Sequence, residues 1–286
     1  MNLSTDVKIQ PIEQRIVYGD KLLFLGSCFA DEIGNICKGL GFDALVNPFG
    51  VLFNPASICQ SVERLESGKD FTKDDVIEVG GEFYCTFSHN TEFWNPSPEK
   101  LLETVNGSLN SARQHFLQAK WIVISLGTSW IYRHKQCGLI VSNCHKLPSQ
   151  LFQREFLTAE QSTELLSQLV EKHKDKQFIF TISPLRHLKD GLHENQISKA
   201  ALLLAVDEIC KRWAQRMDDI MAFTLCSDEP VVAEIIGNLV FKNVYGYSPI
   251  DATKLFGPID EVDADVDETV ELVLYCIDIA LKGVGN

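Results

Sequence analysis

Residues 21–30 read KLLFLGSCFA, and the fold is decided in this stretch. Its first five residues form a short, largely apolar run that ends at a glycine, which is typical of a strand buried on both faces of a parallel sheet. Apolar residues then recur at helical spacing over residues 29–40, and Gly39 and Gly41 end this segment. The stretch therefore predicts a buried strand that passes directly into a helix, with Ser27 at the junction.

The same alternation of strand and helix recurs further along the chain. Helical periodicity between Leu101 and Leu117 precedes the apolar run Trp121–Leu126. A helix expected at about residues 158–173 precedes the run Phe178–Ile182, and another is expected at about 194–216. Strands that alternate with helices form right-handed βαβ units around a parallel sheet. We therefore expect a three-layer α/β/α sandwich with a mostly parallel sheet.

The composition is that of an ordinary globular chain with an uneven charge. The 286 residues are 45% hydrophobic and 23% charged, which is enough for a core without disulfides or metals. A net charge of −13 argues against nucleic acid and anionic membranes as partners. Residues 214–286 carry 4 basic and 14 acidic residues, whereas residues 1–213 carry 22 and 25. We expect one domain over residues 1–286, with a motif-bearing body at 1–213 and a divergent acidic part at 214–286.

The sequence also bears on the compartment. The first residues, MNLSTDVKIQPIEQ, lack the apolar core of a secretory signal, and no apolar run approaches the length of a membrane span. The nine cysteines form no CxxC pair and no metal-finger spacing. An odd number of cysteines without a signal peptide indicates reduced thiols. We expect a cytoplasmic protein; the sequence makes no prediction of its oligomeric state.

Polar, turn-forming residues follow three of the predicted strands. They are Gly26-Ser27-Cys28, Gly127-Thr128-Ser129 and Ser183-Pro184-Leu185-Arg186-His187. Ligands of parallel sheets bind at the carboxyl ends of the strands, so we expect these segments to converge on one site. Ser27 opens a helix, where it is either an N-cap or a nucleophile near free N–H groups. Cys28 is expected to turn inward as a buried core residue.

Residues 26–30, GSCFA, are the signature of the GSCFA family, which belongs to the wider SGNH/GDSL hydrolase group. The sequence resembles that family over roughly residues 1–213. The further matching segments are Asn47-Pro48-Phe49-Gly50, Asn54-Pro55, Gly127-Thr128-Ser129-Trp130, Asn143-Cys144-His145-Lys146 and residues 183–200. The resemblance implies a flavodoxin-like sheet. By analogy with the wider group, it also implies ester hydrolysis or acyl transfer, without naming a substrate. The leading hypothesis is an O-acyl ester on a small molecule or a glycan.

The resemblance also implies roles for single residues. Ser27 matches the nucleophile of the wider group, and its N–H with that of Gly50 would form part of the oxyanion hole. Ser129 stands where that group has an asparagine that donates to the oxyanion. The alternative donors are Thr128, Asn47 and Asn143. Arg186 is either a ligand for an anionic group of the substrate or a surface charge.

The general base is the point at which the sequence departs from the wider group. Related chains carry a C-terminal Asp-x-x-His-Pro segment, but no histidine follows His193 here. Asp190-Gly191-Leu192-His193 is a literal Asp-x-x-His, and Asp190 could orient either His193 or His187. His145 and His89 are further candidates. The alternative hypothesis is a catalytically inactive, SGNH-like binding protein that has lost its base.

The chemistry expected from these residues needs neither a metal nor a cofactor. The one metal-like pattern is the spacing of Asp263, Asp265 and Asp267, which resembles the start of a calcium-binding loop. Glu268 stands where that loop requires glycine, and Leu274 stands where it requires glutamate. The cluster is therefore interpreted as the acidic start of a last helix.

Overall fold

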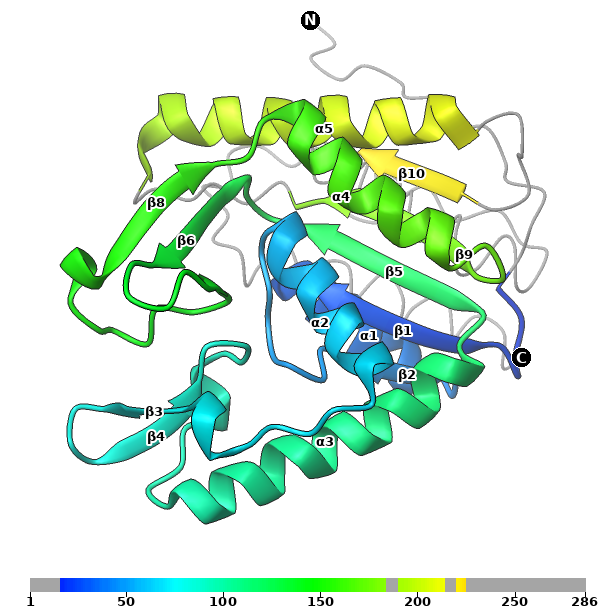
Figure 1. Ribbon diagram of the computed structural model, residues 1–286. Coiled ribbons are helices and arrows are strands. Elements are labelled where there is room, and N and C mark those ends of the chain that lie inside the picture. The colour runs from blue at the N-terminus through cyan, green and yellow to red at the C-terminus, as the bar shows by residue number, and fades with distance from the viewer. Residues whose placement is uncertain (1–15, 184–189, 214–219, 225–286) are drawn as a thin grey trace, which may run out of the picture. The chain divides into compact units, whose positions relative to one another are not determined.

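The computed structural model describes residues 16–183, 190–213 and 220–224 (Figure 1). The chain divides into two units, Asp20–Thr224 and Met1–Gly19 together with Leu225–Asn286. The first unit holds nearly all the described residues, and it is the one described below. Most of the acidic part at 214–286 lies outside the described residues, so the expected organisation of the chain as one domain stays a prediction.

The core of the first unit is a parallel sheet of five strands. They are β1 (Lys21–Gly26), β2 (Asp43–Val46), β5 (Trp121–Leu126), β9 (Gln177–Ile182) and β10 (Ile220–Thr224). Their order is β10-β9-β5-β1-β2, and every pair is parallel. Numbered along the chain, this is the 2-1-3-4-5 order of a flavodoxin-like sheet. The chain changes direction across the sheet between β1 and β5, which makes their carboxyl ends the topological switch point.

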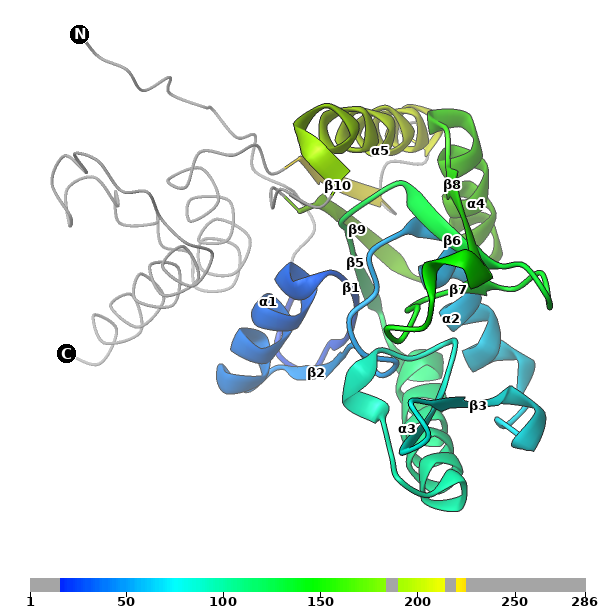
Figure 2. The same ribbon diagram turned by 90° about the vertical axis from the view of Figure 1, so that its left-hand side faces the viewer.

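Helices cover the sheet on both faces, which confirms the predicted three-layer sandwich (Figure 2). Helix α1 (Cys28–Gly39) covers one face of β1 and β2. The opposite face carries α2 (Pro55–Ser67), α3 (Pro98–Gln118), α4 (Ala159–Lys172) and α5 (Gly191–Trp213). The predicted helices at 101–117 and 158–173 correspond to α3 and α4. The last predicted helix corresponds to α5 up to Trp213, and residues 214–216 lie outside the described part.

Alternation along the strands builds this core. In β1, Leu23 and Leu25 belong to the large apolar cluster that includes side chains of α2, α3, α4 and α5. Phe24 lies on the other face, where the Cα of Gly34 in α1 comes so close that a side chain there would meet it. All six residues of β5 are buried, as expected for a strand covered on both sides.

Two small antiparallel sheets, which the periodicity did not predict, are inserted between the strands of the main sheet. One pairs β3 (Val76–Val79) with β4 (Phe83–Thr86), and the other has the order β7-β6-β8. The latter strands are β6 (Trp130–His134), β7 (Ile140–Val141) and β8 (Phe152–Phe156). Three short 3-10 helices lie in the same insertions: η1 (Lys73–Asp75), η2 (Thr91–Phe93) and η3 (Ser149–Leu151). These insertions contain His89, Asn143 and His145.

Gly26 ends β1 in a conformation that only glycine adopts easily. Its φ is +136°, and a Cβ atom built on it would lie 2.1 Å from the carbonyl oxygen of Ser125. The contact is with backbone, which cannot move aside without breaking the pairing of β1 with β5. The glycine therefore permits β1 and β5 to stay paired up to the start of α1.

Replacing Gly26 tests this constraint. We expect Gly26→Ala to lower the free energy of unfolding by at least about 3 kcal/mol, because both the clash and the positive φ oppose the side chain. Gly107→Ala is the matched control, since a Cβ there meets nothing within 4 Å and the residue is inside α3. The control should gain up to about 1 kcal/mol. Urea unfolding of both variants measures this, and equal stabilities would contradict the account.

Candidate functional site

The carboxyl ends of β1, β5 and β9 lie next to one another and carry the polar segments that the sequence singled out. The N–H of Ser27 donates to the Ser125 carbonyl (2.9 Å), and the N–H of Ser183 donates to the Leu126 carbonyl (2.8 Å). These bonds continue the pairing of the strands by one residue on each side of β5. The structure thus brings the starts of all three segments to the switch point.

Ser27 occupies the N-cap position of α1, but its hydroxyl does not cap the helix. Its backbone is extended (φ −69°, ψ 175°), and its side chain makes no capping hydrogen bond. The Oγ atom lies instead 2.7 Å from Oγ of Ser125, and Ser27 is only 1% exposed. The hydroxyl is therefore held in a buried pair at the strand ends. Sequence reasoning missed Ser125; the one available signal was a hydroxyl within the apolar run of β5.

Cys28 is exposed, so the expectation of a buried core cysteine was wrong. It is the first residue of α1, where the chain has already turned away from the sheet. Partial desolvation of the thiol raises its pKa, and the nearby carboxylates of Asp31, Glu32 and Glu92 act in the same direction. The thiol is therefore kept in its neutral form, although it lies at a helix N-terminus.

Asn47 and Gly50 belong to a turn that is fastened to the end of β1. The Asn47 side-chain oxygen accepts from the Gly26 N–H (2.9 Å), and the Leu52 N–H donates to the Gly26 carbonyl (2.8 Å). Asn47 adopts a positive φ of 41°. The Gly50 N–H, expected in the oxyanion hole, donates to the Asn47 carbonyl at 2.7 Å. A Cβ at Gly50 would lie 2.1 Å from Oδ1 of Asn90, so this turn requires glycine.

The segment after β5 is tied to α5. Ser129 donates its N–H to Oγ of Ser198 (2.7 Å) and its hydroxyl to the Ser198 carbonyl (2.9 Å). The Thr128 hydroxyl lies 3.1 Å from the same Oγ. Both candidate oxyanion donors therefore fasten the strand end to the helix. Asn143 accepts from the His145 N–H (2.7 Å), which shapes its own loop.

Lys199 adds a charge to this edge of the sheet. Its ammonium donates to the carbonyls of Gly127 (2.6 Å) and Ser183 (2.5 Å), and thereby links the ends of β5 and β9. Burial lowers the pKa of Lys199 to about 8. Two of its three N–H groups are occupied by backbone oxygens, so we interpret it as a clamp on the strand ends.

His145 is buried, and both nitrogens of its ring have partners. Nδ1 accepts from Nε1 of Trp94 (2.7 Å), and Nε2 donates to the Thr86 carbonyl (2.8 Å). Burial lowers the pKa of His145, although the bond to Thr86 opposes the shift. A neutral ring with two occupied nitrogens has no free lone pair with which to take a proton. We therefore interpret His145 as a residue that holds the fold together and not as a general base.

His89 lies on the other side of Thr86 among aromatic rings. Its Nδ1 is 2.7 Å from the Thr86 hydroxyl, and it packs against Phe49, Phe71 and Phe93. Burial lowers its pKa to about 3, with smaller contributions from His145 and Arg64. The ring therefore stays neutral in the folded protein at any ordinary pH.

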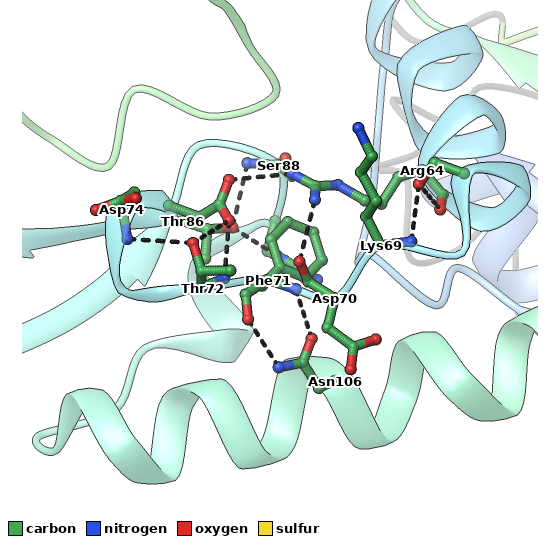
Figure 3. Close-up of polar contacts among 12 residues, drawn as sticks. Arg64, Lys69, Asp70, Phe71, Thr72, Asp74, Thr86, Ser88 and Asn106 are labelled. Carbon is green, nitrogen blue, oxygen red and sulfur yellow. Dashed lines mark hydrogen bonds and ion pairs between the residues drawn. The ribbon is translucent and has the colours of Figure 1, made fainter.

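The polar contacts around Phe71 hold this packing in place (Figure 3). The Arg64 guanidinium lies 4.2 Å from the centre of the Phe71 ring and donates to Asp75 (3.0 Å). Asn106 of α3 binds both the N–H and the carbonyl of Phe71, at 2.7 and 3.0 Å. His89 is thus the inner layer of a stack that joins α2, α3 and the β3–β4 insertion.

The last group of predicted residues flanks the start of α5 in the sequence. Arg186 and His187 lie outside the described residues. Asp190 accepts from Arg154 (2.7 Å), and the same guanidinium lies 3.7 Å from the centre of the Trp130 ring. His193 is exposed in the first turn of α5. Within the described part of the chain, the carboxylate of Asp190 is therefore paired with an arginine and not with His193.

The fold and the strand-end residues define a flavodoxin-like α/β protein with a buried serine pair at its switch point. The GSCFA family model matches residues 21–221, from β1 into β10, and the chain belongs to the GSCFA family. A comparison with curated proteins gave no match. In the described ranges, no helix has the length and apolar character to cross a membrane. No three histidine, cysteine or carboxylate side chains gather there in a manner suited to a metal ion.

The buried neutral His89 predicts acid sensitivity. Its pKa is depressed in the folded state from 6.5 to about 3, so the unfolded chain binds a proton there that the folded protein does not. The titration of His89 therefore costs the folded state almost nothing well above pH 6.5, and it lowers the free energy of unfolding as the pH decreases toward 3. From about pH 7 to about pH 5 this residue should account for a loss of about 2 kcal/mol.

His89→Phe removes the titration while keeping an aromatic ring in the stack. Urea unfolding at the two pH values should show a loss for the variant that is smaller by this amount. The absolute stability of the variant does not enter the comparison, because only the difference between the two pH values is used. An unchanged difference would contradict the assignment of a neutral, buried ring.

Proposed function

We propose that the protein is a serine esterase or O-acyltransferase of the SGNH type, with Ser27 as its nucleophile. The observation that carries this proposal is the state of the Ser27 hydroxyl. It stands at the switch point and at the start of α1, yet it does not cap the helix and pairs only with another hydroxyl. What supports a nucleophile is that this serine, which has no capping role, stands at the place where parallel sheets bind ligands.

Acyl transfer needs stabilisation of the negative charge that develops on the substrate oxygen. The N–H groups of Ser27 and Gly50 have backbone acceptors in this structure. We therefore assign the stabilisation of this negative charge mainly to the first turn of α1, beginning with the N–H of Cys28. The first N–H groups of a helix have no acceptor within it, and the helix dipole adds to their effect. The amide that follows the nucleophile serves the same purpose in other serine hydrolases.

His187 and His193 are the histidines that we propose as alternative general bases. His89 and His145 are excluded from this role by their burial and their contacts with Thr86. In the sequence, His187 follows Ser183, the residue directly after β9, by four positions, and His193 lies in the first turn of α5. Either imidazole would take the Ser27 proton as the bond from Oγ to the acyl carbon forms, and return it to the leaving alcohol.

The proposed substrate is an O-acyl ester on a small molecule or a glycan, and the proposed mechanism uses no cofactor. The family relationship and the strand-end serine support the ester chemistry. The glycan and the cytoplasmic location stay predictions from the sequence.

Hydrolysis of p-nitrophenyl acetate by the full chain tests the nucleophile. We expect Ser27→Ala to lower kcat/KM by about 10³-fold or more, because the covalent step is lost. Cys28→Ser is the matched control: it changes the adjacent exposed side chain and should retain the wild-type rate within about threefold. Wild-type activity in Ser27→Ala would contradict the serine mechanism, and a loss confined to Cys28→Ser would assign the reaction to the thiol.

The same assay distinguishes the two histidines. His187→Ala and His193→Ala are each other's controls, and one of them should fall to the level of Ser27→Ala while the other stays active. Wild-type rates in both variants would contradict a histidine base at either position.

A second candidate function is binding without catalysis. The observation that favours it is the pairing of Asp190 with Arg154, which leaves the literal Asp-x-x-His without its expected contact. This candidate predicts that wild type and Ser27→Ala are equally inactive toward p-nitrophenyl acetate and bind an acetylated sugar equally well by calorimetry. Turnover that depends on Ser27 would contradict it.

A further inference from the structure

Three hydroxyl side chains lie in a row at the strand ends: the proposed nucleophile Ser27, then Ser125, then Thr181. Ser125 of β5 pairs in register with Gly26 on one side and with Thr181 of β9 on the other. Neighbouring residues at the same register point to the same face of a sheet. Ser125 and Thr181 therefore share one face, next to Ser27, and it is opposite to the face of Ile124 and Phe180 in the apolar cluster.

Two of the three hydroxyls bind each other, and the third, that of Thr181, is left without a direct partner among the described residues. Ser27 and Ser125 pair at 2.7 Å. Thr181 is 5% exposed, and its Oγ1 is a buried atom with no hydrogen-bond partner among the residues that the structure describes. A buried hydroxyl without a partner is destabilising, and in native proteins such a group is normally satisfied by an ordered water.

The spacing of the strands suits one water molecule between Ser125 and Thr181. Adjacent strands lie about 4.8 Å apart, which is close to the span of a single bridging water, and Thr181 makes no direct side-chain hydrogen bond to Ser125. A water there has two hydroxyl partners, Oγ of Ser125 and Oγ1 of Thr181. Two to four polar partners are what a buried water requires.

We propose that a buried water joins Thr181 to Ser125, and that this chain positions Ser27 for attack. Thr181 donates to the water, the water donates to Oγ of Ser125, and Ser125 donates to Oγ of Ser27. The Ser27 proton is then free to point toward the general base. This inference rests on the proposed esterase or acyltransferase function.

No proton crosses this chain during the reaction. The Ser27 O–H bond breaks as the bond from Oγ to the acyl carbon forms, and the proton goes to the histidine base. The Ser125 hydroxyl keeps its own proton and donates to an oxygen that becomes more negative as its proton leaves. Hydrogen bonds to charged groups are stronger than those to neutral groups, so the contact favours the reacting state over the resting state. Ser125 and Thr181 are thus positioning residues.

The experiment combines kinetics with a high-resolution crystal structure of the full chain. Ser125→Ala should lower kcat for p-nitrophenyl acetate by about 10- to 100-fold with little change in KM, because a donor to the reacting oxygen is lost. Thr181→Val, which keeps the side-chain shape, should lower kcat by about three- to tenfold. Thr163→Val is the matched control: Thr163 is a buried threonine of α4 whose hydroxyl binds the Ala159 carbonyl, and kcat should not change.

The crystal structures show whether the proposed water is present. Wild type should show one between Ser125 and Thr181, and Thr181→Val should lack it. Absence of that water from wild type, or wild-type kcat in both Ser125→Ala and Thr181→Val, overturns this inference while turnover that depends on Ser27 leaves the proposed function standing. A wild type without Ser27-dependent turnover overturns the proposed function, and the positioning role with it.

Discussion

The contact between the backbone of Gly26 and the carbonyl group of Ser125 governs the geometry of the whole site. Because Gly26 has no side chain, β1 stays paired with β5 up to its last residue, and the next residue begins the turn into α1. The free groups of Gly26 are then used to attach the neighbouring turn, since its N–H binds Asn47 and its carbonyl binds Leu52. A bulkier residue at this position would disturb the strand end, the turn and the serine pair together.

A second consequence of the fold is that buried histidines stabilise the insertions. Thr86, at the end of β4, offers its hydroxyl to His89 and its carbonyl to His145. Two neutral rings around one threonine join the β3–β4 insertion to the loop after β7, and Trp94 completes the contact from the other side of His145. The histidines that are fixed most firmly are therefore those least able to take a proton. The proposed base is therefore one of the two histidines that follow β9 in the sequence, His187 or His193. Asp190, which stands between them in the sequence, is paired with Arg154.

Periodicity predicted three of the five strands of the main sheet, because buried parallel strands and amphipathic helices leave clear patterns, but it did not predict β2, β10 or α2. It predicted the strands β1, β5 and β9 and the helices α1, α3, α4 and α5. It also predicted the position of Ser27 at a strand end. The short strands β3, β4, β6, β7 and β8 have two to five residues each and too few positions for a pattern. Their pairing depends on tertiary contacts that no local window contains.

The roles of single residues were harder to predict for the same reason. His89 and His145 look like catalytic candidates in sequence, because their partners Thr86 and Trp94 become visible only in three dimensions. Cys28 was expected to turn inward after Ser27, but the start of α1 carries it to the surface. Ser125 was passed over as part of an apolar strand, although it contacts the proposed nucleophile.

The central claim is that Ser27 is a reactive nucleophile at the switch point of the sheet. This claim is tested by treating the full chain with a fluorophosphonate, which phosphonylates activated serines with loss of fluoride, and mapping the adduct by peptide mass spectrometry. We expect a single adduct on Ser27, with none on Ser125 or Cys28 and none in Ser27→Ala. An unlabelled wild-type chain, or equal labelling of wild type and Ser27→Ala, would contradict it.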